Sequence, residues 1–229
     1  MNGRTRTWLK NDVISVENNI TKKDFRKVFW RSFTLLGSFN YEKMEGLAYL
    51  YCIEHILKKI YKDDEEGLKQ AMLRESAAFN MTIAPAPFVM GISIAMEESV
   101  KRDPNFDPAS INAIKVSLMG PLSGIGDTFF WGIFRILACS LSIGFAKAGN
   151  PIAPFILLIL FNIPTFLTRY YGLKIGYTSG NQLLIDLEKS GKNAIVYILC
   201  RYPWCGCHWL YDRKLGNCIM SFRIHNFRK

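Results

Sequence analysis

The residues best suited to chemistry lie in one apolar stretch, residues 114–127. This stretch holds three glycines, one proline and two serines, and it ends at Asp127 between two uncharged runs. A carboxylate inside a membrane is costly, so it marks either a functional site or a structural charge that has a partner. Arg135, eight residues further along the chain, is the candidate partner. The stretch therefore predicts a polar site within apolar surroundings.

The spacing of the candidate residues disfavours other chemistries. Gly124 and Gly126 lack the third glycine and the preceding strand of a dinucleotide-binding loop, and no Gly-Lys-Ser/Thr sequence follows them. The three histidines form no Ser-His-Asp or Cys-His arrangement, and His55 fits a solvated helix histidine better than a catalytic or phosphorylated one. We expect no catalytic residue, no cofactor and no metal site.

The composition excludes several classes of protein. Of the 229 residues, 49% are hydrophobic and 21% charged, which is too apolar for a disordered chain. With 17 glycines and 6 cysteines, collagen-like and disulfide-framework chains are excluded as well. The net charge of +10 does not indicate nucleic acid binding, because five of the ten charges fall in residues 193–229 and no recognition helix is apparent. The remaining excess suits an anionic cytoplasmic leaflet.

The elements that must position Asp127 are apolar segments of unequal length. Only residues 148–168 form an uncharged run that reaches the ~20 residues of a straight membrane span. The apolar runs in 84–96 and 116–146 are shorter and rich in small residues and proline. We therefore predict an all-α integral membrane protein with broken or re-entrant helices in these two regions and at least one full transmembrane helix. A soluble all-helical protein is the alternative.

The N-terminal third of the chain predicts amphipathic helices. Thr21 lies three residues before Asp24, a capping-box variant that opens a helix. Beyond it, aromatic and aliphatic residues recur at helical spacing on one side, with basic residues on the other. This pattern fits a helix in the membrane interface and equally a surface helix on a soluble core. Residues 1–19 contain no signal-peptide core, so we expect a cytoplasmic N-terminus.

Several motifs are more specific than the composition. They are Thr21-Lys22-Lys23-Asp24, Phe29-Trp30-Arg31-Ser32, Asn40-Tyr41-Glu42-Lys43-Met44, Phe79-Asn80, Ile111-Asn112-x-Ile114-Lys115-Val116-x-Leu118-Met119-Gly120-Pro121-Leu122-x-Gly124-Ile125-Gly126-Asp127, Phe161-Asn162 and Arg169-Tyr170-Tyr171-Gly172-Leu173-Lys174-x-Gly176-Tyr177. In this order, from about Thr21 to Asp186, the chain resembles subunit IID of the mannose/fructose/sorbose-family phosphotransferase system.

The resemblance implies a multi-pass subunit of a bacterial inner-membrane sugar transporter. In this family, IIC and IID form the translocation path for mannose-type hexoses, as a trimer of IIC–IID heterodimers with an elevator-like moving part. The phosphoryl group passes from phosphoenolpyruvate to histidines of the soluble IIA and IIB phosphocarriers. Subunit IID carries no phosphohistidine, so the resemblance does not settle whether the chain itself counts as an enzyme.

Four residues are candidates for lining or shaping the sugar path. They are polar groups or a glycine in apolar context, namely Asn40, Glu42, Gly124 and Asp127.

Two departures from the family pattern bear on the same region. Thr128 stands where the family usually has proline, and residues 162–165 read Asn-Ile-Pro-Thr where the family often has Asn-Leu-Val-Arg.

The predicted organisation has four parts. A polar extension covers 1–20, an amphipathic cytoplasmic or interfacial region 21–83, and a membrane domain of IID type 84–192. Residues 193–229 form an aberrant tail, dense in Cys, Trp, Arg and His where the family continues with apolar spans.

Shifting the reading frame of the tail's coding sequence by one nucleotide permits an apolar, glycine-spaced segment. We therefore expect that a frameshift has truncated and inactivated the subunit. The cysteine and histidine residues of the tail lack the ligand spacing that is usual in a zinc knuckle. The alternative function is a non-transporting, membrane-associated interaction protein or remnant.

Overall fold

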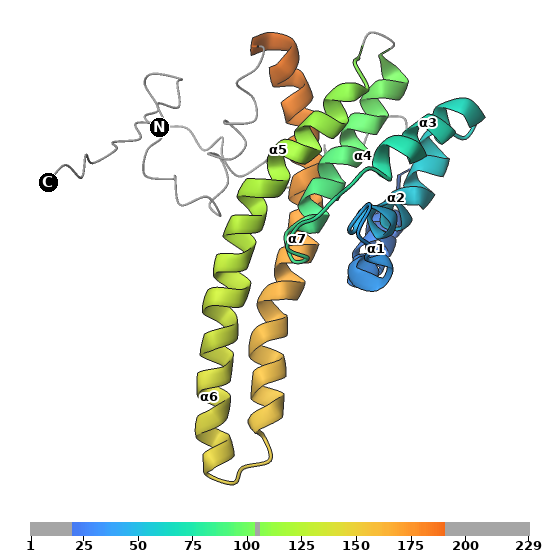
Figure 1. The fold of residues 1–229 in the computed structure, drawn as a ribbon. Helices are drawn as coiled ribbons and strands as arrows, with labels where there is room; N and C mark the ends of the chain where they lie inside the picture. The colour runs from blue at the N-terminus through green and yellow to red at the C-terminus, as the bar shows by residue number, and fades with distance from the viewer. Residues whose placement is uncertain (1–19, 104–105, 191–229) are drawn as a thin grey trace, which may run out of the picture. The chain divides into compact units, whose positions relative to one another are not determined.

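The chain is all-α wherever its structure is described. A computed structural model describes residues 20–103 and 106–190, with side chains as far as residue 180. Figure 1 shows the helices in chain order. They are α1 (Lys22–Arg31), the 3-10 helix η1 (Ser32–Ser38), α2 (Gly46–Ile60), α3 (Glu65–Glu75), α4 (Ala86–Arg102), α5 (Ala109–Gly126), the π-helix η2 (Asp127–Phe134), α6 (Arg135–Lys147) and α7 (Ala153–Ser190).

The first helix begins where the sequence predicts it. The backbone N–H and the hydroxyl of Thr21 both donate to the Asp24 carboxylate at 2.8 Å, which satisfies groups that the first turn leaves unpaired. Burial alone would raise the pKa of this carboxyl, but hydrogen bonds from Lys59 and Thr21 outweigh it and lower the pKa to about 2. The same carboxylate therefore caps α1 and ties it to α2.

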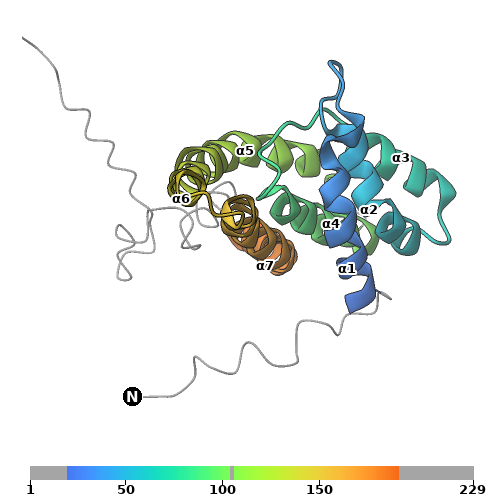
Figure 2. The same ribbon diagram turned by 90° about the horizontal axis from the view of Figure 1, so that it is seen from below.

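Helix α4 forms the centre of the packed region. Its residues from Val89 to Glu98 are all buried, and it contacts both α2 and α5. Figure 2, viewed along α6 and α7, shows α4 between these longer helices and the group formed by α1, α2 and α3. The apolar run at 84–96 lies at the start of one continuous core helix, so the break expected there is absent. The remainder of the protein covers this helix.

The second expected break, in 116–146, is also not a loop. Residues Ala109–Lys147 run as one helix whose hydrogen bonding widens to the π type between Asp127 and Phe134. Pro121 is accommodated inside α5. The interruption predicted from the sequence takes the form of this π-helix, because a helix can absorb proline and glycine by local changes in its hydrogen bonding.

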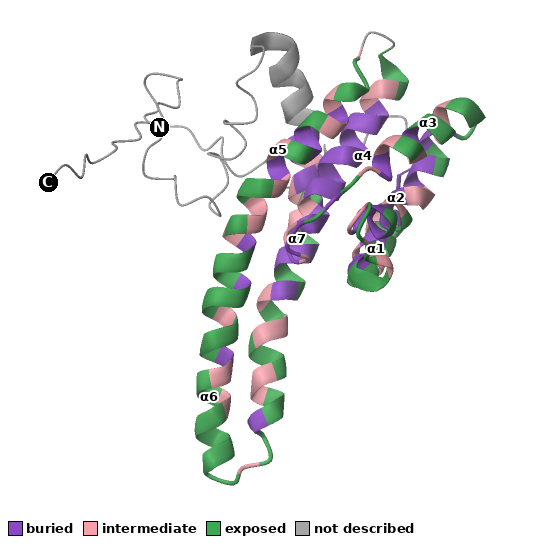
Figure 3. Ribbon diagram, in the orientation of Figure 1, coloured by how far each residue is buried: buried purple, intermediate pink, exposed green. Residues whose placement is uncertain are grey.

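Helices α6 and α7 form an antiparallel hairpin that projects from the packed region (Figure 1). Gly149 turns the chain at φ +69°, a left-handed conformation that favours glycine. Ala109–Lys147 and Ala153–Gly180 are each long and apolar enough to cross a membrane, so the described residues hold two candidate spans. Figure 3 shows that the hairpin is mostly exposed. Exposed apolar helices of this length fit a lipid environment better than the core of a soluble protein.

Candidate functional site

Two loops and helix α5 are linked to one another ahead of the π-helix. The loop before α2 pairs with the loop before α4, since Glu45 N–H donates to the Phe79 carbonyl at 2.8 Å. The loop before α4 in turn touches α5, where Asn80 N–H points at the Met119 sulfur at 3.4 Å. Met44 adopts a positive φ of 52°, which is unusual for a residue other than glycine. The loop before α4 is thus held between the loop before α2 and helix α5.

Asp127 has a specific partner, but it is not the expected one. The Thr82 hydroxyl donates to Asp127 Oδ1 at 2.6 Å, and it also lies 3.2 Å from the Ser123 carbonyl and 3.3 Å from the Ser123 hydroxyl. Arg135 instead lies over the Trp131 ring, 5.1 Å from its centroid. The proposed Asp127–Arg135 pair is wrong, because the two residues are eight positions apart in one helix and each side chain has another neighbour.

The glycines beside Asp127 differ in their surroundings. Gly126 packs against Thr82, and a Cβ atom at Gly126 would lie 2.8 Å from the Thr82 Cβ. Gly126 therefore allows the close approach that brings Thr82 to Asp127. Gly124 is exposed, with nothing within 4 Å of the position a Cβ would take. Among the predicted site residues, Gly124 and Asp127 lie about one turn apart in the continuous helix Ala109–Lys147.

Asn40 and Glu42 lie on the neighbouring loop and are engaged differently. The Asn40 side chain accepts hydrogen bonds from the backbone N–H of Glu42 at 3.1 Å and of Lys43 at 2.8 Å. It also donates to the Ser38 carbonyl at 3.1 Å, so it holds its own loop in shape. Glu42 is exposed. Within the described residues, no contact joins either side chain to Asp127.

Buried charges form a second group of polar residues that the sequence analysis missed. Lys115 Nζ lies 3.0 Å from Glu75 Oε2 and 3.1 Å from the Glu75 carbonyl, with both side chains almost fully buried. The same ammonium group lies 4.3 Å from the centroid of the Tyr49 ring. A buried pair of this kind costs desolvation, so it fixes how α5 meets α3 more than it adds stability.

Glu97 of α4 forms a second buried network. Arg74 donates to both carboxylate oxygens of Glu97, at 3.0 Å and 2.8 Å, and the Tyr61 hydroxyl donates to one of them at 2.8 Å. Burial raises the pKa of Glu97, and the nearby Glu75 adds to the rise. The hydrogen bonds from Arg74 oppose it.

Glu45, directly before α2, and Arg169 of α7 are two further buried charged residues. Burial raises the pKa of Glu45 to about 7, although the Met81 N–H and Arg169 oppose the rise. Glu45 Oε2 has no hydrogen-bond partner in the described part of the chain. Arg169 of α7 donates to the carbonyl and the hydroxyl of Ser32, at 2.7 Å and 3.0 Å, and lies over the Phe33 ring. Arg169 therefore fastens η1 to α7.

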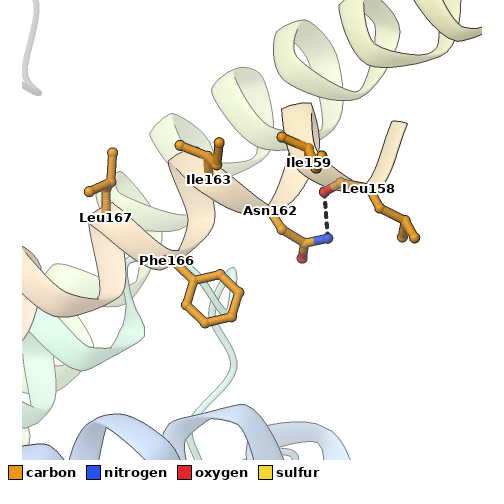
Figure 4. A pocket seen from close by; sticks show the side chains of 6 residues that line it. All are labelled: Leu158, Ile159, Asn162, Ile163, Phe166 and Leu167. Carbon is orange, nitrogen blue, oxygen red and sulfur yellow. Dashed lines mark hydrogen bonds between the residues drawn. The ribbon is translucent and has the colours of Figure 1, made fainter. Parts of the chain in front are cut away.

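A shallow hollow on α7 does not suit a polar solute. Figure 4 shows its lining side chains, all from one helix. Asn162 is the polar residue among them, and its amide donates to the Leu158 carbonyl at 2.7 Å. Sugars need several hydrogen-bonding groups, so this surface fits lipid or a partner helix better. Among the described residues, no group of three or more His, Cys, Asp or Glu side chains could hold a metal ion.

Fold and site together define an α-helical membrane protein with a polar cluster where a long apolar helix changes to π-type hydrogen bonding. The family model for the PTS system mannose/fructose/sorbose family IID component matches residues 19–199. The chain belongs to this family. It is 36% identical over 173 residues to the PTS system mannose-specific EIID component of Escherichia coli (strain K12), covering 76% of this chain and 61% of the relative.

Two further comparisons agree with this assignment. The Fructose permease IID component of Bacillus subtilis (strain 168) is 36% identical over 171 residues, which cover 75% of this chain and 62% of that protein. The cryoEM structure of the mannose transporter ManYZ with microcin E492 matches with a TM-score of 0.72 and 33% identity, covering 83% of this chain and 68% of that one. The chain thus spans about three fifths of the length of its curated relatives.

Some sequence-based expectations fall on residues that are not described. Residues 1–19 of the predicted polar extension (1–20) and the whole tail at 193–229 lie outside the described residues, so the frameshift stays a prediction. The family match ends at residue 199, shortly after the predicted boundary at 192.

Proposed function

We propose that this protein is the IID membrane subunit of a phosphoenolpyruvate-dependent sugar transporter and forms, with a IIC subunit, a path for mannose-type hexoses. The relatives named for mannose-specific and fructose components support the substrate class. The hydrogen-bonded cluster of Thr82, Ser123 and Asp127 carries the proposal, because it places a carboxylate and two hydroxyls beside the middle of a long apolar helix. Carboxylates and hydroxyls are the groups that hydrogen-bond a sugar.

The assembly and its placement are part of the same proposal. We infer a trimer of IIC–IID heterodimers in the bacterial inner membrane, served by soluble IIA and IIB phosphocarriers. The chain would cross the membrane more than once, with its N-terminus in the cytoplasm. The ManYZ neighbour supports an IIC partner, since it is a mannose transporter of related fold. The protein itself would carry no phosphorylated residue.

The test is hexose uptake by the chain expressed with IIC and the phosphocarriers in bacteria that lack their own mannose-family transporter. We expect Asp127→Asn to lower uptake roughly tenfold or more, because a charge-assisted hydrogen bond is lost. Asp63→Asn is the matched control, since Asp63 is exposed at the start of α3. Undiminished uptake by Asp127→Asn at normal membrane levels would remove Asp127 from the path.

The composition of the tail favours a second candidate function. If residues 193–229 replace the apolar spans of the family, the protein is a membrane-associated remnant that binds lipid or a partner without transporting sugar. Resequencing the gene from codon 185 onward tests this. A shifted frame that stays open and encodes apolar spans would support the remnant, and a shifted frame that closes quickly would make the written tail native.

A further inference from the structure

One face of α1 carries basic side chains that no described residue neutralises. Lys22, Lys23, Arg26 and Lys27 are all exposed, and none of them forms an ion pair with any residue that the structure describes. We call these four residues the basic face. The Asp24 carboxylate between them turns inward and is held by Lys59 at 2.7 Å and 2.8 Å.

The basic face is unfavourable on local grounds. Lys22 and Lys23 occupy the first turn of α1, where the positive end of the helix dipole disfavours cations. Four like charges within six residues also repel one another. Cations at the positive end of a helix and clustered like charges are both unfavourable, so their presence points to a compensating anion outside the helix.

The same surface continues as exposed apolar side chains toward the end of η1. Trp30 is 60% exposed and Leu36 is 54% exposed, and Phe33 and Phe39 are exposed beside them. Aromatic and aliphatic groups of this size are rarely left in water as a contiguous surface. Along the chain, the basic face therefore comes first and the exposed apolar surface follows it.

Contacts with α7 set the depth of α1 along the membrane-crossing helix. Three ring pairs join the two segments, namely Phe25–Tyr177 at 5.0 Å, Phe29–Tyr170 at 6.0 Å and Phe33–Phe166 at 4.9 Å. The start of α1 is thus level with residue 177, and η1 is level with residue 166. The basic face lies toward the more polar part of α7, where Lys174 is exposed, and the apolar surface lies toward the hairpin.

The length of α7 places this level at a membrane surface. From Ala153 at the hairpin turn to Tyr170 the helix rises about 27 Å at 1.5 Å per residue. The hydrocarbon core of a bilayer is about 30 Å thick. Tyr170 and Tyr171 are exposed at the end of this rise, as in the aromatic belts that mark membrane boundaries, and the Lys174 ammonium donates to the Tyr170 hydroxyl at 2.7 Å.

We propose that the basic face of α1 binds the headgroups of anionic phospholipids, while Trp30 and Phe33 enter the boundary of the same leaflet. The basic side chains supply the charge that complements the headgroups, and the apolar surface is continuous with the membrane-crossing surface of α7. The site holds the α1–α3 region at the surface of one leaflet. This leaflet is the one on the opposite side of the membrane from the turn of the α6–α7 hairpin. It goes beyond sugar transport and does not depend on it.

The first experiment measures lipid binding by the purified full chain in detergent, using native mass spectrometry. Phosphatidylglycerol is the probe, and phosphatidylcholine is the neutral comparison. We expect the chain to bind phosphatidylglycerol more than tenfold more tightly, since each basic side chain near a headgroup contributes roughly fivefold. The quadruple variant Lys22→Gln, Lys23→Gln, Arg26→Gln and Lys27→Gln should lose this preference.

Two controls make the result specific. Lys62→Gln with Lys69→Gln removes exposed charge elsewhere and should leave the preference unchanged. Lys22→Arg with Lys23→Arg and Lys27→Arg retains the charge and should retain binding. Equal affinity for the two lipids, or undiminished binding by the quadruple variant with normal helix content, would overturn the proposal.

The second experiment tests the depth of Trp30 in bilayers of brominated phosphatidylglycerol. Quenching is measured for the full chain and for its Trp30→Phe variant. The difference between the two isolates the Trp30 indole from the other four tryptophans. We expect strong quenching by bromine near the headgroup and weaker quenching by bromine near the chain ends. An unquenched Trp30, or one shielded when IIC is added, would assign the surface to a protein partner and overturn the proposal.

Discussion

Lys115 and Glu75 are charged residues inside a packed protein, 40 positions apart in the chain. We expect Lys115→Met to destabilise the protein by about 3–5 kcal/mol, because it leaves the Glu75 carboxylate buried without its cation. Thermal unfolding of the detergent-solubilised chain, followed by circular dichroism, measures the loss. Lys115→Met combined with Glu75→Leu should recover much of it, and a double variant no more stable than Lys115→Met would contradict the pairing.

Glu45 gives the stability a pH dependence of defined sign. Its pKa is raised by burial from 4.5 to about 7, so the folded state favours the protonated carboxyl. Glu45 therefore contributes stability below pH 4.5, and that contribution is lost as the pH rises through 7. We expect Glu45→Gln to flatten the fall in melting temperature across this window, with Asp63→Asn as the control. An unchanged pH profile in Glu45→Gln would show that another group is responsible.

Sequence reasoning succeeded where partners are local. The Thr21–Asp24 cap was confirmed because both residues belong to one helix turn, where spacing alone fixes the contact. It failed for Asp127, whose partner Thr82 lies 45 residues earlier in the chain. The buried Lys115 stood within the longest family motif, and a lysine between isoleucine and valine was the one signal that could have marked it.

Helices α4 and α7 cross with almost no space between their backbones. A Cβ at Gly176 would collide with the Phe88 carbonyl, and a Cβ at Gly91 would lie 2.5 Å from the Leu173 carbonyl. We expect Gly176→Ala to cost about 1–3 kcal/mol, because backbone atoms cannot move aside as a flexible side chain can. Thermal unfolding measures it.

Gly144 provides the matched control for this crossing. It also lies within a helix, but nothing is within 4 Å of its Cβ position, so Gly144→Ala should be tolerated. Equal melting temperatures for the Gly176 and Gly144 variants would contradict the close approach of α4 and α7.

The two long helices agree with the prediction of at least one transmembrane helix, and they show why only one candidate span was evident from uncharged runs. The sequence analysis counted uncharged runs, and Asp127 and Arg135 divided one 39-residue helix into pieces that each seemed too short. In the fold, Asp127 is hydrogen-bonded to Thr82, and Arg135 lies over the Trp131 ring. Because these charges have polar or aromatic neighbours, the helix continues through them.

At the scale of the molecule, the described residues combine a packed region of α1–α4 with a projecting, largely exposed hairpin. The exposed Gly124 and the apolar faces of α6 and α7 are surfaces that a IIC subunit and lipid could cover together. The all-α class and the family were predictable from the sequence, since they rest on hydropathy and long motifs. The depth of α1 along α7 was not, because it depends on ring contacts between residues more than 130 positions apart.

The most direct test is co-purification of the tagged full chain with a mannose-family IIC subunit expressed in the same bacteria. Membranes are solubilised in mild detergent, and the two subunits are quantified after affinity and size-exclusion chromatography. The account predicts a stable complex with equal amounts of IIC and this protein. Recovery of the membrane-inserted chain without IIC would contradict its role as a transporter subunit and favour the non-transporting remnant.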